Sequence, residues 1–282
     1  MIEVIKPGYY TCLQDQGRRG YRHLGVPLAG PMDPKAYALA MALLPYQKDS
    51  SVFECTLIGP SLRLHQSLRF VITGGTMEAT LDDRPLEMNR VYVAEKGSEL
   101  SLGKSTEGIR TYLRFEAELK VEKTLGSVAY FSPITIKNQL RKGDVLKLNS
   151  SPEQLQTNPV HLKVDNAYLY QNRVEVIRGP DWSLLSKKQQ QQLLSERHQV
   201  VSHSRMGYRL STSLEVKADQ LLSQLVLPGM VQLTPGGELL VATADCQVTG
   251  GYLQVLQLTD TSLASLVQKR EGDLLTFQNT LQ

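Results

Sequence analysis

Short runs of alternating apolar and polar residues, separated by glycine and proline, make up most of this 282-residue chain. In the first half they are SLRFVITGG, MEATLDDRPL with its Asp-Asp turn signal, and RVYVAEKGSELSLGKSTEGIRTYLRF. In the second half they are RVEVIRGP, QVVSHSRMGYRL, GMVQL, ELLVATAD, YLQVLQLT and DLLTF. Strands at this spacing predict a mainly β protein of sandwich or barrel architecture, rather than one of alternating strands and helices.

Three segments have the pattern of helices. Residues 32–44 hold an apolar run behind Asp33, a preferred N-cap residue, and Pro34, which suits the first helical position. Residues 181–198 predict a second helix, which begins at its first residue and carries an apolar side. Residues 260–269 predict a short third helix with an Asp or Thr cap.

The chain is long enough for two domains. Residues 149–160, NSSPEQLQTNPV, are rich in Ser, Pro, Asn and Gln and predict a linker. LRKGDVLKL precedes this segment and VQKREGDLLTF lies near the end of the chain, so a Gly-Asp turn and a strand close each half. We therefore expect an N-terminal β-rich module at residues 1–150 and a C-terminal one at residues 160–282.

Charge and hydropathy limit the expected partners. The formal net charge is +3, without a tract that favours nucleic acid or an anionic membrane as partner. The first ten residues lack the pattern of a signal peptide, and the longest apolar helical stretch, residues 36–44, is about half of a membrane span. We expect a cytoplasmic protein. Its cysteines, Cys12, Cys55 and Cys246, have no paired spacing and are expected to be buried thiols.

Familiar phosphate and metal motifs are missing from the sequence. In GSELSLGKS, five residues separate Gly97 from Gly103 where a phosphate-binding loop has four, and no helix pattern follows. The five histidines form no local ligand pair, and the cysteines form no cluster with them. No metal site is predicted.

The densest stretch of candidate chemistry is QDQGRRGYRHLGVP, residues 14–27. Arg18, Arg19 and Arg22 could bind a carboxylate or a phosphate in forked geometry. His23 and Asp15 are candidate proton-transfer groups. The alternative, a basic turn with exposed arginines, fits the same residues equally well.

A second candidate is ADCQVTGGYLQV, residues 244–255. Asp245, Gln247 and Thr249 alternate along a strand end, and the backbone N–H groups of Gly250 and Gly251 could bind an anion. The alternative is a Gly-Gly hairpin whose polar side chains bind no ligand. Two isolated residues add to the candidates: Gln232 in PGMVQL is a possible ligand contact, and Glu54 in FECTLIGP would need a partner if it is buried.

Several motifs together resemble the allophanate hydrolase subunit 2 family, which includes the C subunit of 5-oxoprolinase, the Kip anti-antikinase protein and half of the carboxyltransferase region of urea carboxylase. The resemblance covers about residues 2–277, and the first and last motifs are the specific ones. In chain order the motifs are YTCLQDQGRRGYRHLGVPLAGPMD, ECTLIGPSLRL, ITGG, GIRTYL, RKGDVL, SRMGYRL, PGMVQL and ADCQVTGGY.

The resemblance implies a cyclophilin-like β-barrel architecture and a partner, the B subunit of 5-oxoprolinase, which is similar to allophanate hydrolase subunit 1. Together with the A subunit, such a set opens 5-oxoproline to glutamate, with ATP as co-substrate of the complex. The amide oxygen of a lactam becomes a good leaving group once it is phosphorylated, and the charge of that step calls for arginines and backbone donors.

The family's residues carry over onto matching positions of this chain. From residue type and loop context, we expect anion binding by Arg18, Arg22 and Arg205, and proton transfer by His23 or Asp15. Residues at the last motif would hold the amide or the phosphoryl group, with Asp245 also a candidate catalytic group; they are Asp245, Gln247, Thr249, Gly250, Gly251 and Tyr252.

The chain departs from the family in its middle loops. AMALLPYQ replaces an asparagine- and glycine-containing segment, paired glycines after residue 113 are lost, and Val128-Ala129 stands where the family has Ser-Thr. These losses favour an alternative, a non-catalytic regulatory protein that sequesters a kinase-inhibitor-like partner. A further alternative is the carboxyltransferase component of a urea or amide carboxylase system.

Overall fold

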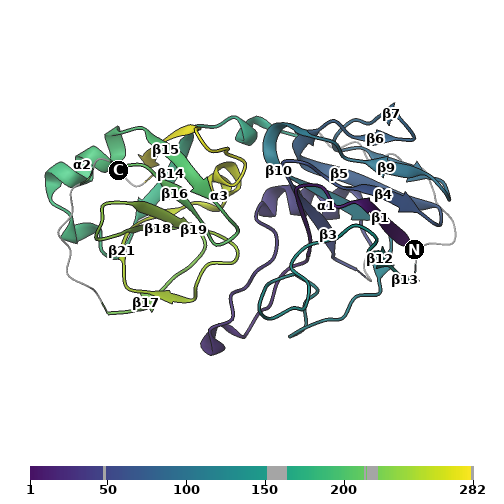
Figure 1. Ribbon diagram of the computed structural model, residues 1–282. Coiled ribbons are helices and arrows are strands. Elements are labelled where there is room, and N and C mark those ends of the chain that lie inside the picture. Colours follow the sequence, from purple (N-terminus) through teal and green to yellow (C-terminus); the bar gives the residue numbers. More distant parts are fainter. Residues whose placement is uncertain (47–48, 151–163, 213, 215–221, 281–282) are drawn as a thin grey trace. The chain divides into compact units, whose positions relative to one another are not determined.

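The computed structural model describes residues 1–46, 49–150, 164–212, 214 and 222–280. Among these, strands far outnumber helices (Figure 1), so the predicted mainly β class is confirmed. The chain divides into two compact units, Met1–Arg18 with Ala29–Asn166, and Arg19–Leu28 with Ala167–Gln282. Most of the predicted linker lies outside the described residues, so the predicted module boundary stays a prediction.

The first unit is a sandwich of two sheets with a short extra strand pair. One sheet has the order β12-β1-β4-β9-β6-β7, the other has the order β2-β3-β10-β5-β8, and β11 pairs with β13. The strands are β1 (Ile2–Lys6), β2 (Tyr10–Gln14), β3 (Val52–Thr56), β4 (Ser61–Leu64), β5 (Leu68–Met77), β6 (Thr80–Leu81), β7 (Arg84–Pro85), β8 (Val91–Ala94), β9 (Glu99–Ser101), β10 (Ser105–Phe115), β11 (Glu118–Leu119), β12 (Val145–Leu146) and β13 (Leu148–Ser150).

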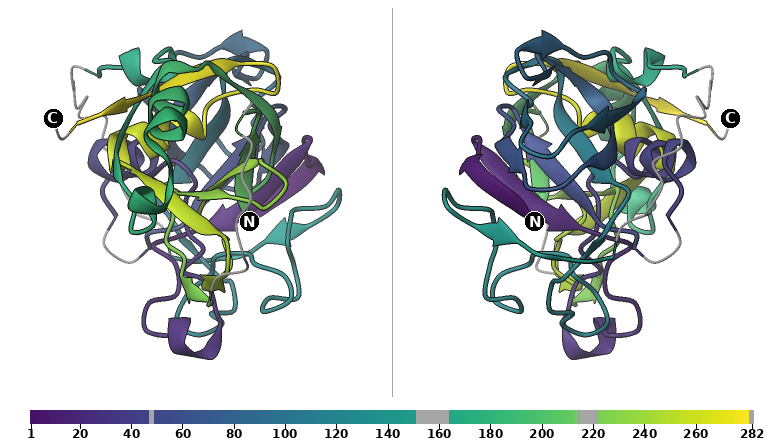
Figure 2. Two further views of the ribbon diagram at one scale, coloured as in Figure 1. Left: turned by 90° about the vertical axis from the view of Figure 1, so that its left-hand side faces the viewer. Right: turned by 90° about the vertical axis from the view of Figure 1, so that its right-hand side faces the viewer.

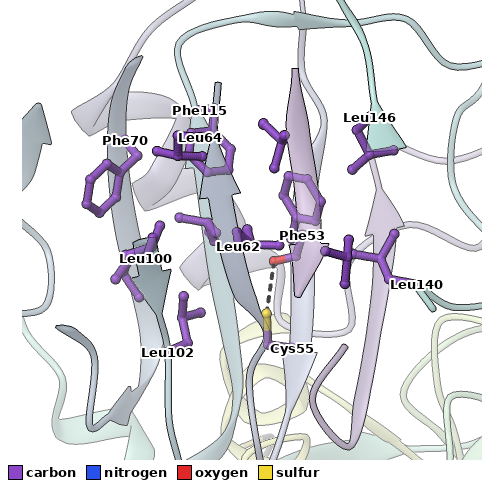
Figure 3. Packing of buried hydrophobic residues seen from close by; sticks show 14 of the residues in the cluster. Phe53, Cys55, Leu62, Leu64, Phe70, Leu100, Leu102, Phe115, Leu140 and Leu146 are labelled. Carbon is purple, nitrogen blue, oxygen red and sulfur yellow. Dashed lines mark hydrogen bonds between the residues drawn. The ribbon is translucent and has the colours of Figure 1, made fainter. Parts of the chain in front are cut away.

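The apolar core of this unit lies between the two sheets. Leu62 and Leu100 come from one sheet, and Phe53 and Phe70 come from the other (Figure 3). Phe53 and Phe115 pack edge to face, with ring centroids 5.8 Å apart. Since neighbouring residues of a strand point to opposite faces, the alternation in the sequence supplies one core-facing side chain in two.

Helix α1 (Pro34–Leu43) covers the outer face of the five-stranded sheet. Asp33 caps it by accepting a hydrogen bond from the Ala36 amide, with Pro34 in the first turn, as the sequence predicts. The apolar residues of α1 pack on Val52, Val71 and Tyr112 of the sheet. The central strands are therefore buried on both faces, and β3 has no exposed residue.

Arg114 of β10 holds the chain that follows α1. Its side chain is 1% exposed, and its guanidinium group donates to the carbonyl oxygens of Leu44 (2.7 Å), Ser51 (3.2 Å), Tyr46 (3.1 Å) and Asp49 (2.8 Å). Four carbonyl partners compensate the desolvation of one buried cation. The segment in which the chain departs from its family thus has its own internal anchor.

The second unit is a closed barrel with the order β14-β21-β18-β19-β16-β15-β22. It closes because β22 runs parallel to β14 and antiparallel to β15 (Figure 1, Figure 2). A separate pair joins β17 to β20. The strands are β14 (Arg173–Arg178), β15 (His198–His203), β16 (Gly207–Leu210), β17 (Gln224–Leu225), β18 (Met230–Leu233), β19 (Leu239–Ala242), β20 (Thr249–Gly250), β21 (Leu253–Leu258) and β22 (Leu274–Asn279).

Helices α2 (Lys187–Ser195) and α3 (Asp260–Leu266) lie in this unit, with 3-10 turns η1 (Arg22–Leu24), η2 (Ala167–Leu169) and η3 (Trp182–Leu184). The predicted start of α2 at Asp181 is wrong. Ser186 and Gln189 form a reciprocal capping box, which begins the helix one turn later, and only η3 precedes it.

Among the described residues, none of the helices combines the length and the apolar composition that crossing a membrane requires.

Replacing Arg114 by lysine removes the forked geometry that reaches four carbonyl groups. We expect Arg114→Lys to lower the free energy of unfolding by about 3 kcal/mol, since buried hydrogen bonds to a charged group contribute about 1.5–3 kcal/mol each. Urea unfolding followed by far-UV circular dichroism measures this. The control is Arg63→Lys, whose exposed pair with Glu99 predicts a change below about 1 kcal/mol. Equal midpoints for the two variants would contradict the anchoring role.

Candidate functional site

The first motif is divided between the two units after Arg18. Its first part ends β2 in the first unit and contacts residues 127–130 of the same unit. Asp15 accepts hydrogen bonds from the Ser127 hydroxyl (2.5 Å) and the Val128 amide (2.9 Å), besides its own turn bond from the Gly17 amide (2.9 Å). The Asp15 carboxylate therefore organises a loop and is 8% exposed.

Gln14 and Arg18 extend this contact along the same loop. The Gln14 amide donates to the Tyr130 carbonyl oxygen (3.3 Å), and the Arg18 guanidinium group donates to that of Ala129 (2.5 Å). Both side chains are 0% exposed. We call Gln14, Asp15 and Arg18 the clamp. The contacts show that the clamp binds the loop of residues 127–130. Proton transfer by Asp15 and anion binding by Arg18 stay predictions.

The rest of the first motif belongs to the second unit. Its tip is η1, which ends at Gly25 in left-handed conformation (φ 76°). Arg22 donates to the Val226 carbonyl oxygen, so η1 and β17 lie at the same end of this unit (Figure 2). The predicted proton-transfer residue His23 is exposed on η1.

Arg205 and Asp245 form a bidentate ion pair in the second unit. Arg205 Nε donates to one carboxylate oxygen and Nη2 to the other, both at 2.8 Å, and each side chain is 8% exposed. The Asp245 amide also donates to the Arg205 carbonyl oxygen at 2.8 Å. Two neighbouring motifs of the prediction are thus joined, but their opposite charges largely neutralise each other.

A carboxamide pair stands beside Gly250. Gln247 Nε2 donates to Gln232 Oε1 at 3.2 Å, and the buried Gln232 Nε2 has no partner among the described residues. A Cβ atom at Gly250 would lie 3.1 Å from Gln232 Nε2 and 3.4 Å from Gln247 Nε2. Glycine at this position therefore leaves the two amides room, and the NH2 group of Gln232 remains without a partner among the described residues.

The other predicted residues of the last motif surround this pair. Thr249 and Gly250 form β20, which pairs with β17, while Gly251 and Tyr252 follow, with Tyr252 40% exposed. Cys246 is buried, and this burial raises the pKa of its thiol to about 11, against a smaller opposite effect of Arg22. All three cysteines are buried, as the sequence predicts, and Cys246 is a poor nucleophile at neutral pH.

Sequence reasoning marked Glu54 as in need of a partner, but it missed the buried polar network in the first unit that supplies one. Glu54 accepts hydrogen bonds from the Tyr112 hydroxyl and the Met32 amide, both at 2.8 Å, and its other oxygen lies 3.8 Å from Arg110 Nη1. Burial is the largest cause that raises the pKa of the Tyr112 phenol. Arg110 and Tyr112 alternate along β10, a pattern that suits a solvent-facing side as well as a covered one. The network joins the start of α1 to the sheet.

Metal binding has no candidate in the part of the chain that the structure describes, where no three His, Cys, Asp or Glu side chains come together. The arrangement in the second unit offers neutral amide donors, one paired arginine and an exposed imidazole. Such groups suit recognition of a carbonyl or carboxamide better than capture of a metal ion.

Comparison with known proteins decides the family. The carboxyltransferase domain model, subdomains A and B, matches residues 24–279. The chain belongs to this family. Among its relatives, the C subunit of 5-oxoprolinase from Escherichia coli (strain K12) is 28% identical over 98% of this chain and 90% of its own length. The urea amidolyase of Saccharomyces cerevisiae is 30% identical over 98% of this chain, but over only 16% of its own length.

Solved structures of carboxyltransferase domain relatives share the fold. The Kluyveromyces lactis urea amidolyase superimposes with a TM-score of 0.86 at 28% identity, over 98% of this chain and 18% of that chain. The urea carboxylase of the same organism superimposes with a TM-score of 0.85 at 27% identity, over 98% of this chain and 27% of that chain. The chain thus spans a small part of these large enzymes and nearly all of the bacterial oxoprolinase relative.

Breaking the ion pair of this domain should destabilise the second unit. We expect Asp245→Asn to lower the free energy of unfolding by about 3–5 kcal/mol, because it leaves the Arg205 guanidinium group buried without its counter-charge. Fluorescence of Trp182, the single tryptophan, reports unfolding of this unit in urea. The matched control is Glu238→Gln, whose pair with Arg209 is about half exposed and predicts a loss below about 1 kcal/mol. A similar loss in both variants would show that the buried pair is not special.

Proposed function

We propose that this chain is one component of an ATP-dependent 5-oxoprolinase, or of a related amide-acting complex, and that it acts with a B subunit as partner. The match to the C subunit of the Escherichia coli 5-oxoprolinase over nearly the full length of both proteins carries this proposal. A second relative of the same name, from Haemophilus influenzae, is 27% identical over 99% of this chain and 91% of its own length. Both relatives are named as subunits, which implies that they work within an assembly.

The chemistry explains why such a complex needs donors rather than a metal in this chain. A five-membered lactam is a poor electrophile, and transfer of a phosphoryl group from ATP to its oxygen makes that oxygen a leaving group. Water then adds to the ring carbon, and the C–N bond breaks to leave γ-glutamyl phosphate and ADP. A second water releases phosphate from this acyl phosphate and leaves glutamate. Since the sequence holds no phosphate-binding loop, we expect the complex, rather than a motif of this chain, to bind ATP.

In the proposed site, Gln232 and Gln247 hold the lactam carbonyl or its amide through N–H donors. Gly250 supports this role, because its missing side chain keeps the approach to both amides open. His23, exposed on η1, is the proposed proton-transfer group. In this proposal, Arg205 and Asp245 act as an ion pair that fixes the neighbouring loop.

Carboxyl transfer is a second candidate function. The family description and the urea amidolyase match favour it. This chemistry moves a carboxyl group from carboxylated biotin to urea or a similar amide, so it requires a biotin carboxylase and a carrier besides this chain. The substrate amide would use the same carboxamide donors.

Reconstitution tests the proposal directly. The purified chain, mixed with homologues of the A and B subunits of 5-oxoprolinase, should release glutamate from 5-oxoproline with stoichiometric ADP formation, and none of the three alone should do so. A parallel mixture with carboxybiotin and urea tests carboxyl transfer. Glutamate release without this chain would contradict the proposal, and carboxybiotin consumption alone would establish the second candidate.

Two exposed side chains allow a test that does not disturb the fold. We expect His23→Gln to lower kcat about 100-fold, the range of general acid–base catalysis. Gln247→Ala should lower kcat/KM about tenfold, because the variant lacks the amide that bonds to Gln232 and, in the proposed site, to the substrate. Matched controls are His65→Gln and Gln199→Ala, which alter the same residue types at sites away from the proposed donors. Full activity of both test variants would contradict the residue assignment.

A further inference from the structure

A groove of about 490 Å³ lies in the first unit, between residues 120–137 and strand β12. Its volume is within the range of small-molecule sites, about 300–1,000 Å³. None of the residues predicted from the two main motifs lines it. The groove is therefore separate from the carboxamide pair of the second unit, and the following proposal does not depend on the proposed function.

Backbone hydrogen bonds and the clamp fix the walls of the groove. Val128 and Tyr130 form one wall, and the clamp binds the backbone of this segment. On the opposite side, the Lys120 amide donates to the Lys147 carbonyl oxygen at 2.8 Å, and Leu146 pairs with Ile2 of β1. A site whose walls are held in this way is preformed and costs little ordering when a ligand binds.

Tyr130 offers an unused hydrogen-bond donor in this groove. Its side chain is 5% exposed and belongs to the apolar core of the unit. The phenolic hydroxyl has no hydrogen-bond partner among the described residues, and it is not one of the fully buried polar atoms, so it reaches solvent where Tyr130 lines the groove. Burial raises the pKa of this phenol, which keeps its proton available at neutral pH.

The segment that supplies most of the groove lining is basic in sequence, although the chain as a whole shows no basic tract. Residues 120–147 hold six lysines and arginines against two acids, a formal charge of +4, which exceeds the +3 of the entire chain. Lys120 is exposed at the rim, whereas Lys137 is paired with Asp144 at 2.7 Å. Glu122 is the one carboxylate in the lining.

The remaining lining holds two threonines, Thr124 and Thr135, and is otherwise apolar. Val121, Ile134 and Ile136 line the groove, and Ile136 is 99% exposed. An isoleucine fully exposed to water gains free energy when a ligand covers it. The Tyr130 hydroxyl without a partner among the described residues, the Lys120 ammonium group and the apolar side chains together favour a molecule with a single anionic head and an apolar body.

We propose that this groove is a binding site for a small amphipathic organic anion, an aliphatic monocarboxylate. The Tyr130 hydroxyl donates to the carboxylate, Lys120 supplies the opposite charge, and the apolar body packs on Val128 and Ile136. Neither a nucleotide nor a dianion fits as well, because the second lysine of the lining, Lys137, is already paired with Asp144 and most of the wall is apolar.

Isothermal titration calorimetry on the full chain tests the proposal with octanoate, 1-octanol and octylamine, which share one chain length and differ in charge. Octanoate should bind at least about fivefold more tightly than the alcohol and the amine. Tyr130→Phe should weaken octanoate about tenfold, since hydrogen bonds to charged groups contribute about 1.5–3 kcal/mol. Lys120→Gln should weaken it about two- to fivefold, as for an exposed ion pair.

The control variant is Lys187→Gln, an exposed lysine of α2 in the other unit, which should leave octanoate affinity unchanged. Weakening by either groove variant, together with preference for octanoate, supports the proposal. Absence of octanoate binding, equal affinity for the three probes, or binding that neither groove variant weakens would overturn it. Because lactam hydrolysis plays no part in this measurement, its outcome is distinguishable from that of the reconstitution.

Discussion

Burial of charged side chains is the constraint on which both units depend. A charge removed from water must meet an opposite charge or several hydrogen-bonding groups. Arg114 binds four carbonyl groups of the chain after α1, and Arg205 binds Asp245 through two parallel hydrogen bonds. These partners lie far away in the sequence, so the charges fix loops that have little apolar surface of their own.

The same constraint changes the meaning of the first motif. In the sequence, its arginines, aspartate and glutamine indicate a ligand site. In the structure, Gln14, Asp15 and Arg18 satisfy the backbone and the hydroxyl of residues 127–130. The clamp gives that loop a defined conformation. One face of the loop then becomes the wall of the proposed anion groove.

The proposed ligand recognition in the second unit has a different physical basis. The closed barrel leaves no free sheet edge among its seven strands, so functional groups are placed on the connections at its ends. Gln247 lies on such a connection and meets Gln232 of barrel strand β18, so two neutral carboxamides stand beside Gly250 in a unit whose Arg205–Asp245 pair cancels its own charges. Neutral donors suit the carbonyl group that a lactam and urea have in common.

The sequence alone determined the mainly β class, the cap and start of α1, and the family, because these depend on local alternation, on Asp33 and Pro34, and on ordered motifs. The start of α2 could not be read from the sequence, because two N-caps were possible. The capping box of Ser186 and Gln189 forms, and Asp181 does not cap the helix. Only the tertiary structure decided the roles of the charged residues. Arg110, Tyr112 and Arg114 alternate along β10 as residues of a solvent-exposed strand face do, but α1 covers that face. Likewise, Asp15 and its partners Ser127 and Val128 are more than a hundred residues apart. Local patterns cannot encode such pairing, since burial and partner choice arise only when distant segments pack together.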